Sequence, residues 1–291
     1  MVAQRLRHLG WGGLNFYDCA DTACSSRVVR PLVQGGLGAK GGVMALLPGD
    51  RAVVGDEGSS IQGNAFDLRG HTCVDAGCTS AEVQTLKDYP DDAGHSLFDL
   101  QLESSEVGDL YVSWIRVPGP VSQTEWQFLH CPGGDCSEAV PSLVSGATPT
   151  SFPERVSMAI REDGRPLLLD GQSGRRALID CSDPGCASSV VHALPVPTTG
   201  IAGGLALDTE GRANFFRFEG GQLEFHTCLD ATCSDTNSVH ISLPSSLIST
   251  WDFGRAPDGR LGLAYVAAGS RQARFATCGD GRLFSNGFET Q

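Results

Sequence analysis

The sequence has no long hydrophobic run and comparatively few basic residues. No stretch approaches about 18 consecutive apolar residues, so no helix is predicted to span a bilayer. Lysine and arginine number 21 against 34 aspartate and glutamate residues, which gives a net charge of −13 at pH 7. Because phosphate contacts require clustered Lys and Arg, this balance excludes nucleic acid as an expected partner. It argues equally against an anionic membrane surface.

The sequence also lacks the short motifs of several large enzyme classes. It contains no G-x-S-x-G, no H-E-x-x-H and no P-loop. These patterns place a nucleophilic serine, a zinc ion and a nucleotide phosphate, respectively. No catalytic residue, resident metal or cofactor is therefore predicted.

Cysteine, in contrast, is abundant and regularly spaced. Of the 11 cysteines, all but one belong to C-x4-C pairs whose first members recur every 47 to 58 residues. Such a period indicates a repeat architecture with one supersecondary unit per copy. A further copy begins at Cys278 but has Leu283 in place of its second cysteine. The pairs are Cys19–Cys24, Cys73–Cys78, Cys131–Cys136, Cys181–Cys186 and Cys228–Cys233.

We predict that each pair forms a short disulfide after the third strand of its unit. Even, closely spaced cysteines are typical of an oxidising compartment, so a secreted, periplasmic or outer-surface protein is expected. A zinc site is an alternative, because His71, His130 and His226 precede three of the pairs, and a redox role is another. The first residues, MVAQRLRHLG, contain no apolar leader. The sequence is therefore expected to begin after a cleaved leader or, as we favour, to be a fragment that begins at an internal Met. Cys278 is expected to be a free thiol or to bridge outside the chain.

The repeat unit reads as four short β-strands. Apolar residues alternate with period two, as in LEFHT and ALID, and Gly, Asp and Pro separate the segments. The first turn is regular, and its glycine supplies the positive φ of a tight hairpin; its copies are Glu162-Asp163-Gly164-Arg165, Thr209-Glu210-Gly211-Arg212 and Pro257-Asp258-Gly259-Arg260. Together these features predict an all-β fold, a β-propeller of about six four-stranded blades. A β-solenoid is the rival interpretation.

The propeller is predicted over residues 1–277, with repeats ending near residues 24, 78, 136, 186, 233 and 278. Residues 1–34 supply only the later strands of a blade. The two chain ends are therefore expected to complete one blade together, or an upstream segment belongs to a longer ring. Residues 278–291 are expected to form a C-terminal tail or, alternatively, the fourth strand of the last blade. The protein is expected to be a monomer.

The cysteine turns have the form C-x-D-x-x-C, as in Cys73-Val74-Asp75-Ala76-Gly77-Cys78 and Cys228-Leu229-Asp230-Ala231-Thr232-Cys233. This form resembles a class of secreted bacterial β-propeller repeats, distant relatives of the sialidase-type propellers. The resemblance covers nearly the whole chain and implies the fold and export, but little about function. The ending CGDGRLFSNGFET is similar to a short tail of exported Gram-negative proteins that closes in F-x-x-G-F-E. The S-x-D-x-G-x-T-W boxes and the arginine triad of sialidase-type enzymes are not found.

A binding face is predicted where the second-to-third turns and the blade-to-blade loops of a propeller emerge. Its carboxylates could hold a cation or act on a glycan, and its tryptophan could stack on a sugar ring. The alternative is that acidic turn residues are only solvated. The two tryptophans inside predicted strands, Trp114 and Trp126, are expected in the core. The candidate residues of the face are Asp56, Glu57, Asp170, Glu219, His95, Arg155, Trp251 and Asp252.

Three functional hypotheses follow. The first is a secreted or cell-surface binding module with a glycan or protein ligand. The second is a degenerate sialidase-like glycoside hydrolase or lyase, with its acid and base among Asp56, Asp170, Glu219 and Asp252. The third is a structural spacer domain of a larger exported protein.

Overall fold

The structure is a computed structural model. It describes residues 4–8, 13–19, 27–34, 40–59, 66–89, 96–117, 124–144, 156–171, 176–219, 221–242, 248–255, 259–267, 273–279 and 282–283. By its internal contacts the chain forms two compact units. Unit 1 is Met1–Val144 with Thr148–Phe152, and unit 2 is Ser145–Ala147 with Pro153–Gln291.

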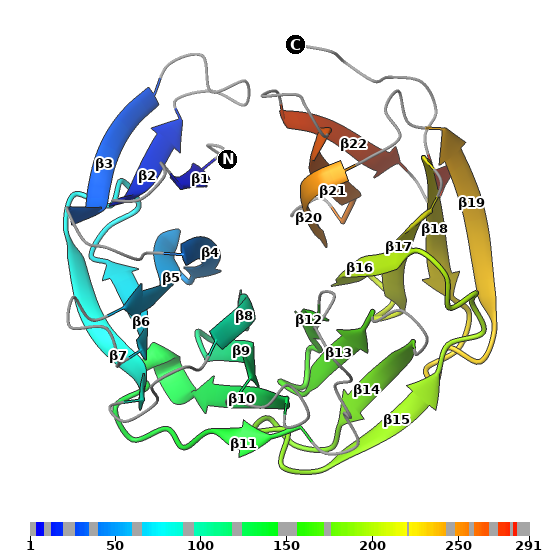
Figure 1. The fold of residues 1–291 in the computed structure, drawn as a ribbon, viewed down its shortest axis with the longest axis horizontal. Coiled ribbons are helices and arrows are strands. Elements are labelled where there is room, and N and C mark those ends of the chain that lie inside the picture. The colour runs from blue at the N-terminus through cyan, green and yellow to red at the C-terminus, as the bar shows by residue number, and fades with distance from the viewer. Residues whose placement is uncertain are drawn as a thin grey trace. The chain divides into compact units, whose positions relative to one another are not determined.

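Unit 1 contains three antiparallel sheets in which successive strands of the chain are neighbours (Figure 1). The first has three described strands, and the other two have four each. The strands are β1 (Gln4–His8), β2 (Gly13–Cys19), β3 (Arg27–Gln34), β4 (Lys40–Leu47), β5 (Arg51–Ser59), β6 (Phe66–Cys73), β7 (Ala81–Tyr89), β8 (Ser96–Ser104), β9 (Leu110–Val117), β10 (Glu125–Cys131) and β11 (Ser142–Leu143).

Unit 2 contains three sheets of the same pattern, each with four described strands (Figure 1). The strands are β12 (Val156–Ile160), β13 (Pro166–Asp170), β14 (Ala177–Cys181), β15 (Ser189–Ala193), β16 (Ile201–Leu207), β17 (Ala213–Glu219), β18 (Gln222–Cys228), β19 (Thr236–Ser242), β20 (Ile248–Arg255), β21 (Leu261–Ala267), β22 (Ala273–Gly279) and β23 (Arg282–Leu283).

The predicted all-β fold of four-stranded repeats is confirmed within each unit. Among the described residues the only helical segment is the 3-10 turn Pro132–Gly134, and no helix is long and apolar enough to cross a membrane. The first and last described strands, β1 and β23, are assigned to separate sheets. The last sheet gains its fourth strand from β23, in which Leu283 pairs with Cys278.

The hydrophobic core of each unit lies between neighbouring sheets. In unit 1, Val53 and Leu68 pack with Leu102 and Trp114 of the next sheet. Such packing needs apolar residues on both faces of a sheet, and β9 meets this need because six of its successive residues are buried. The expectation that Trp114 and Trp126 are core residues is confirmed, since they are 0% and 3% exposed.

The turn between the first two strands of a sheet depends on one glycine. Gly164, Gly211 and Gly259 have φ values of 79°, 76° and 84°, as the sequence predicted. A side chain is strained in this left-handed region, whereas glycine adopts it freely. The hairpins therefore close at these positions.

Four of the five predicted disulfides are confirmed, and Cys24 of the pair Cys19–Cys24 lies outside the described residues. The motif aspartate organises the turn inside the bridge. Asp230 accepts hydrogen bonds from the backbone N–H groups of Thr232, Ser234 and Asp235. Asp183 does the same for Ala187 and Ser188. The recurring C-x-D-x-x-C spacing thus produces a compact turn at the end of the third strand.

Candidate functional site

The predicted binding-face residues that the structure describes lie in the first or second strands of their sheets. The structure describes six of the eight: Asp56 and Glu57 within β5, Asp170 at the end of β13, Glu219 at the end of β17, and Trp251 and Asp252 within β20. His95 and Arg155 lie outside the described residues.

The predicted carboxylates differ sharply in exposure. Asp56, Glu57 and Asp170 are 0%, 6% and 2% exposed, whereas the side chain of Glu219 is 41% exposed. A ligand at the surface therefore has access to Glu219 but not to the other three. Burial of an ionised carboxylate is costly unless partners compensate for the lost water.

Asp56 has such partners in unit 1. Its Oδ2 lies 3.0 Å from Nη2 of Arg69, and its Oδ1 lies 2.9 Å from Nε2 of His71. Asp56 is directly opposite Arg69 in the register of β5 and β6. The carboxylate is thus held by a cation and an imidazole inside the sheet, and it is not presented as a general acid or base for a surface substrate.

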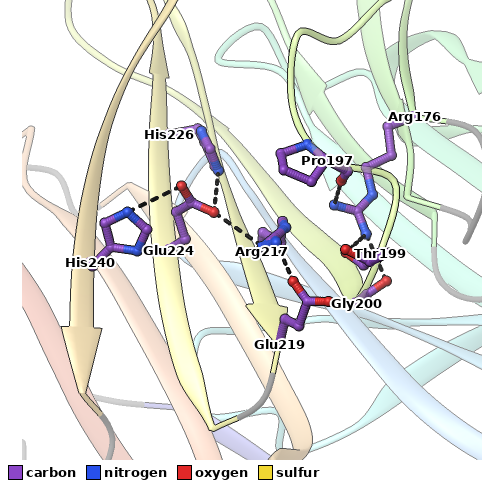
Figure 2. Close-up of polar contacts among 9 residues, drawn as sticks. All are labelled: Arg176, Pro197, Thr199, Gly200, Arg217, Glu219, Glu224, His226 and His240. Carbon is purple, nitrogen blue, oxygen red and sulfur yellow. Dashed lines mark hydrogen bonds and ion pairs between the residues drawn. The ribbon is translucent and has the colours of Figure 1, made fainter.

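A second charged cluster occurs in unit 2, where a row of side chains crosses one sheet (Figure 2). Arg217 on β17 is directly opposite Glu224 on β18, which is directly opposite His240 on β19. Glu224 lies 3.2 Å from the Arg217 guanidinium and 3.4 Å from the His240 ring, and Arg217 also binds Glu219. The Arg217 and Glu224 side chains are only 11% and 14% exposed, so solvent screens this pair less than a surface pair.

His226 lies two residues beyond Glu224 on the same strand and therefore on the same face of the sheet. Its ring stacks on Phe215 at 4.9 Å between centroids, and its Nε2 lies 3.5 Å from Oε2 of Glu224. Burial lowers the pKa of His226 to about 4, against the opposing effect of the Glu224 carboxylate. The imidazole is therefore neutral at pH 7.

The two clusters occupy the same place in their sheets. His71 and His226 each lie two residues before the first cysteine of a bridge. In both, the residue two positions before the histidine belongs to a directly opposite ion pair. The order of charge is reversed: the second strand carries the acid in unit 1, as Asp56, and the base in unit 2, as Arg217.

Arg176 forms a separate clamp beside this cluster (Figure 2). Its buried guanidinium donates hydrogen bonds of 2.6, 2.7 and 2.6 Å to the carbonyl oxygens of Pro197, Thr199 and Gly200. Gly200 in turn leaves no space beside Glu219, because a Cβ on Gly200 would lie 2.8 Å from the Glu219 Cβ. The clamp fixes the segment that leads into β16, which is a structural role.

A pocket of about 400 Å³ opens in unit 2 on the side of the first hairpins. Its walls come from the β12–β13 turn, the β16–β17 turn and the end of β20. The guanidinium-bearing residues Arg161, Arg165 and Arg255 line it together with the apolar residues Ile160 and Leu207. Four acidic residues and Thr209 complete its polar lining.

Two of these acids brace the hairpin turns. Asp163 accepts hydrogen bonds from the Arg165 backbone N–H at 3.1 Å and from Arg165 Nε at 2.7 Å. Asp208 accepts the same pair of bonds from Arg212, at 2.9 and 2.8 Å. Partial burial opposes ionisation of both carboxylates, but the arginine and backbone hydrogen bonds outweigh it and lower the pKa of Asp163 and of Asp208.

The arginines of the pocket are held in place by neighbouring groups. Arg161 Nη2 lies 3.2 Å from Oδ2 of Asp180, while its buried Nε has no hydrogen-bond partner among the described residues. Arg255 Nη1 donates to the backbone oxygen of Asp208 at 3.0 Å. The pocket thus presents preorganised donors beside acceptor carboxylates.

Sequence reasoning did not identify this pocket, since it assigned the hairpin turns to closure alone and placed the binding face elsewhere. The available signal was the recurrence of a charged pair around each turn glycine, such as Asp163 with Arg165. The volume of the pocket and the closeness of Arg161 to Arg255 cannot be predicted from residue spacing in the sequence. Both depend on how adjacent hairpins pack.

Comparison with known proteins establishes the fold. No protein-family model and no curated protein sequence matches the chain. An α-L-arabinofuranosidase of Fusarium graminearum, solved with an iminosugar inhibitor, superposes with a TM-score of 0.61 at 8% identity, covering 95% of this chain and 92% of that one. An α-L-arabinanase of Penicillium chrysogenum, complexed with arabinobiose, gives 0.60 at 11% identity and 91% and 86% coverage. A luciferin-regenerating enzyme gives 0.56 at 15% identity and 95% and 88% coverage.

The two carbohydrate-active neighbours are β-propellers with blades of four antiparallel strands. The chain therefore has a propeller fold, as its cysteine-marked repeats predicted. At identities of 8% to 15%, this likeness concerns the fold alone.

Proposed function

We propose that the protein is an exported carbohydrate-binding propeller, and that the pocket between the first hairpins of unit 2 is its saccharide site. The observation that carries the proposal is the pocket itself. Its volume of about 400 Å³ lies within the range of small-ligand sites. Its lining combines guanidinium donors with carboxylate acceptors.

The chemistry of the lining suits a sugar. Each sugar hydroxyl both donates and accepts a hydrogen bond, so a site needs both kinds of partner at fixed positions. Arg161 and Arg255 supply donors and Glu162 and Glu210 supply acceptors, while Ile160 gives an apolar contact for the ring face. Two neighbours of the fold were solved with a saccharide or a sugar mimic, as their names state. Four disulfides are compatible with export.

Binding is favoured over glycoside hydrolysis by the state of two of the four acids, Asp163 and Asp208. A glycosidase needs one carboxylic acid that keeps its proton near neutral pH, and therefore a raised pKa. In this pocket the pKa values of Asp163 and Asp208 are lowered, because arginine and backbone donors stabilise the carboxylate form. Both carboxylates also accept the hydrogen bonds that hold their turns, so they are not available for proton transfer.

The earlier candidate face is not part of the proposed site, because Glu219 lies at the end of β17 that is away from the β16–β17 turn. Glu219 is the exposed carboxylate at that end of β17, held by Arg217. Trp251 and Asp252 lie on β20, the strand that ends at Arg255.

A saccharide panel that includes arabinobiose, neutral oligosaccharides and uronic-acid oligosaccharides tests the proposal by isothermal titration calorimetry. We expect saturable binding of at least one member with a Kd on the order of 0.1–1 mM, typical of a small polar ligand. The variants Arg255→Gln and Thr209→Val should each weaken that binding about tenfold through the loss of one hydrogen bond.

The matched control is Glu138→Gln, an exposed acid in a turn of unit 1, which should leave the affinity unchanged. If the wild type, the two pocket variants and the control all bound the saccharide with equal affinity, the ligand would bind outside this pocket. Absence of binding across the panel would refute the carbohydrate proposal. Release of reducing sugar, lost in Glu162→Gln, would favour the hydrolase instead.

A further inference from the structure

A second pocket, of about 290 Å³, lies in unit 1 and has a different lining from the first. It is formed by Val29–Leu32 of β3 and by residues of the neighbouring sheet that include His71, Thr79 and Val83. It is independent of the proposed saccharide site, which belongs wholly to unit 2.

Two nitrogen atoms on residues of this pocket are buried without a partner. Nδ1 of His71 and Nε of Arg30 are shielded from solvent and have no hydrogen bond in the described part of the chain. The His71 side chain is only 3% exposed. An unsatisfied buried polar group lowers stability, so such groups usually have a partner that completes them.

The contact between Nε2 of His71 and Asp56 fixes the orientation of the ring. Its Nε2 lies 2.9 Å from the Asp56 carboxylate, which accepts a hydrogen bond from Nε2–H and is itself held by Arg69 at 3.0 Å. Nδ1 is therefore the ring atom that remains for a ligand. A carboxylic acid can donate to the neutral ring, and a carboxylate can accept from the protonated ring. In both cases one proton is shared between the ligand carboxyl and Nδ1.

The charge of the lining selects an anion. None of the described residues that line the pocket is acidic, although the chain carries 34 acidic residues and a net charge of −13. Arg30 is the cation of the lining, and the hydroxyl-bearing residues Thr79 and Ser80 lie on its rim. Asp75 is a further charge near Arg30. It is not a lining residue, and its carboxylate accepts hydrogen bonds from Thr79.

The remaining walls are apolar. Val29, Pro31, Leu32 and Val83 provide them, and the volume lies at the lower end of small-ligand sites. We propose that this pocket binds a small monocarboxylic acid with an apolar body, its carboxyl group between Arg30 and His71 and its hydrocarbon part against β3.

Benzoate is the probe, and benzamide, which has the same shape without the acidic group, is its matched control. Titration calorimetry should give a benzoate Kd on the order of 1 mM, as expected for a ligand of so few atoms. Benzamide should bind at least about tenfold more weakly, because it lacks the charge that pairs with Arg30. Equal binding of the two compounds, or no saturable heat up to about 20 mM benzoate, would overturn the proposal.

Variants locate the site. Arg30→Gln, which alters a half-exposed side chain, should weaken benzoate binding about tenfold, and Arg30→Lys should retain part of the affinity. Arg51→Gln, an exposed arginine outside the pocket, should bind as the wild type does. In the unmodified protein, benzoate should also shift the Nδ1 resonance of His71 in nitrogen NMR. An unshifted His71, or an unchanged affinity in Arg30→Gln, would contradict the assignment.

Discussion

Arg217 on β17 lies directly opposite Glu224 on β18, with 3.2 Å between the guanidinium and the carboxylate. The corresponding position in unit 1 holds Asp56 opposite Arg69, so the same ion pair is built with the charges exchanged. Each charge is compensated by the opposite charge across the strand pair. This compensation is the same whether the second or the third strand of the sheet carries the acid. The pair is therefore a structural element of the second hairpin in both sheets.

Exchange of the two charges in unit 2 tests this relationship. Arg217→Asp or Glu224→Arg alone leaves like charges opposite each other in a shielded place and should lower the free energy of unfolding by about 3 kcal/mol. The double variant restores an opposite pair and should recover at least half of that loss. Urea denaturation measures all three proteins.

Glu219 must be neutral in this experiment, since it also binds Arg217. The substitution Glu219→Gln is therefore made in every protein of the series. If the double variant were as unstable as the sum of the single variants, the two residues would not act as a pair.

The buried neutral His226 should make stability depend on pH. Its folded pKa is about 4, below the ordinary value of 6.5, because burial disfavours the charged ring. Above about pH 6.5 the ring is neutral in both states. As the pH falls toward 4, the unfolded chain takes up the proton first, so the folded state loses roughly 3 kcal/mol over this window.

The control for this window is His226→Gln, which stays uncharged at every pH. Its unfolding free energy, measured in urea between pH 7 and pH 4, should fall less steeply than that of the wild type. Parallel curves for the two proteins would show that His226 titrates alike in the folded and unfolded states.

Alanine substitutions at Gly204 and Gly211 should distinguish the stability cost of a steric clash from that of backbone strain. Both glycines have positive φ, at 60° and 76°. A Cβ on Gly204 would lie 2.5 Å from Phe216 Cε1 and from Phe253 Cβ, whereas a Cβ on Gly211 meets nothing within 4 Å. Gly211→Ala should therefore cost about 1 kcal/mol from strain alone, and Gly204→Ala about 3 kcal/mol or more. Similar losses in thermal or urea unfolding would contradict the packing around Phe216.

Removal of one disulfide should lower stability modestly. The bridge Cys181–Cys186 spans a sequence separation of 5, and so short a loop contributes about 2 kcal/mol in the chain-entropy model. The double variant Cys181→Ser with Cys186→Ser is compared with the wild type in urea without reductant. A loss of about zero would show that the turn bonded by Asp183 already restrains the unfolded chain.

The features that sequence predicted correctly are those with a local cause. Alternating apolar residues predicted the strands, Gly164 and Gly211 predicted the hairpin turns, and spacing predicted the disulfides. The burial of Trp114 followed from its place inside an apolar run. Each of these depends on residues close in the chain.

The features that it missed depend on register and packing. Asp56 was expected on an open face, but its burial reflects the pairing with Arg69, which is known only once β5 and β6 are aligned. The convergence of Arg161 with Arg255 requires three successive sheets to pack side by side. The sequence separation of such residues carries no information about their distance.

Amide NMR mapping is the most direct test of whether the pocket of unit 2 binds a saccharide. The isotopically labelled protein is titrated with the saccharide panel, and shifted backbone amides are assigned. A saccharide bound in the pocket should cause saturable shifts at Glu162, Asp163, Thr209 and Gly211, which border it. Saturable shifts confined to other residues, or no shifts with any saccharide, would contradict binding in this pocket.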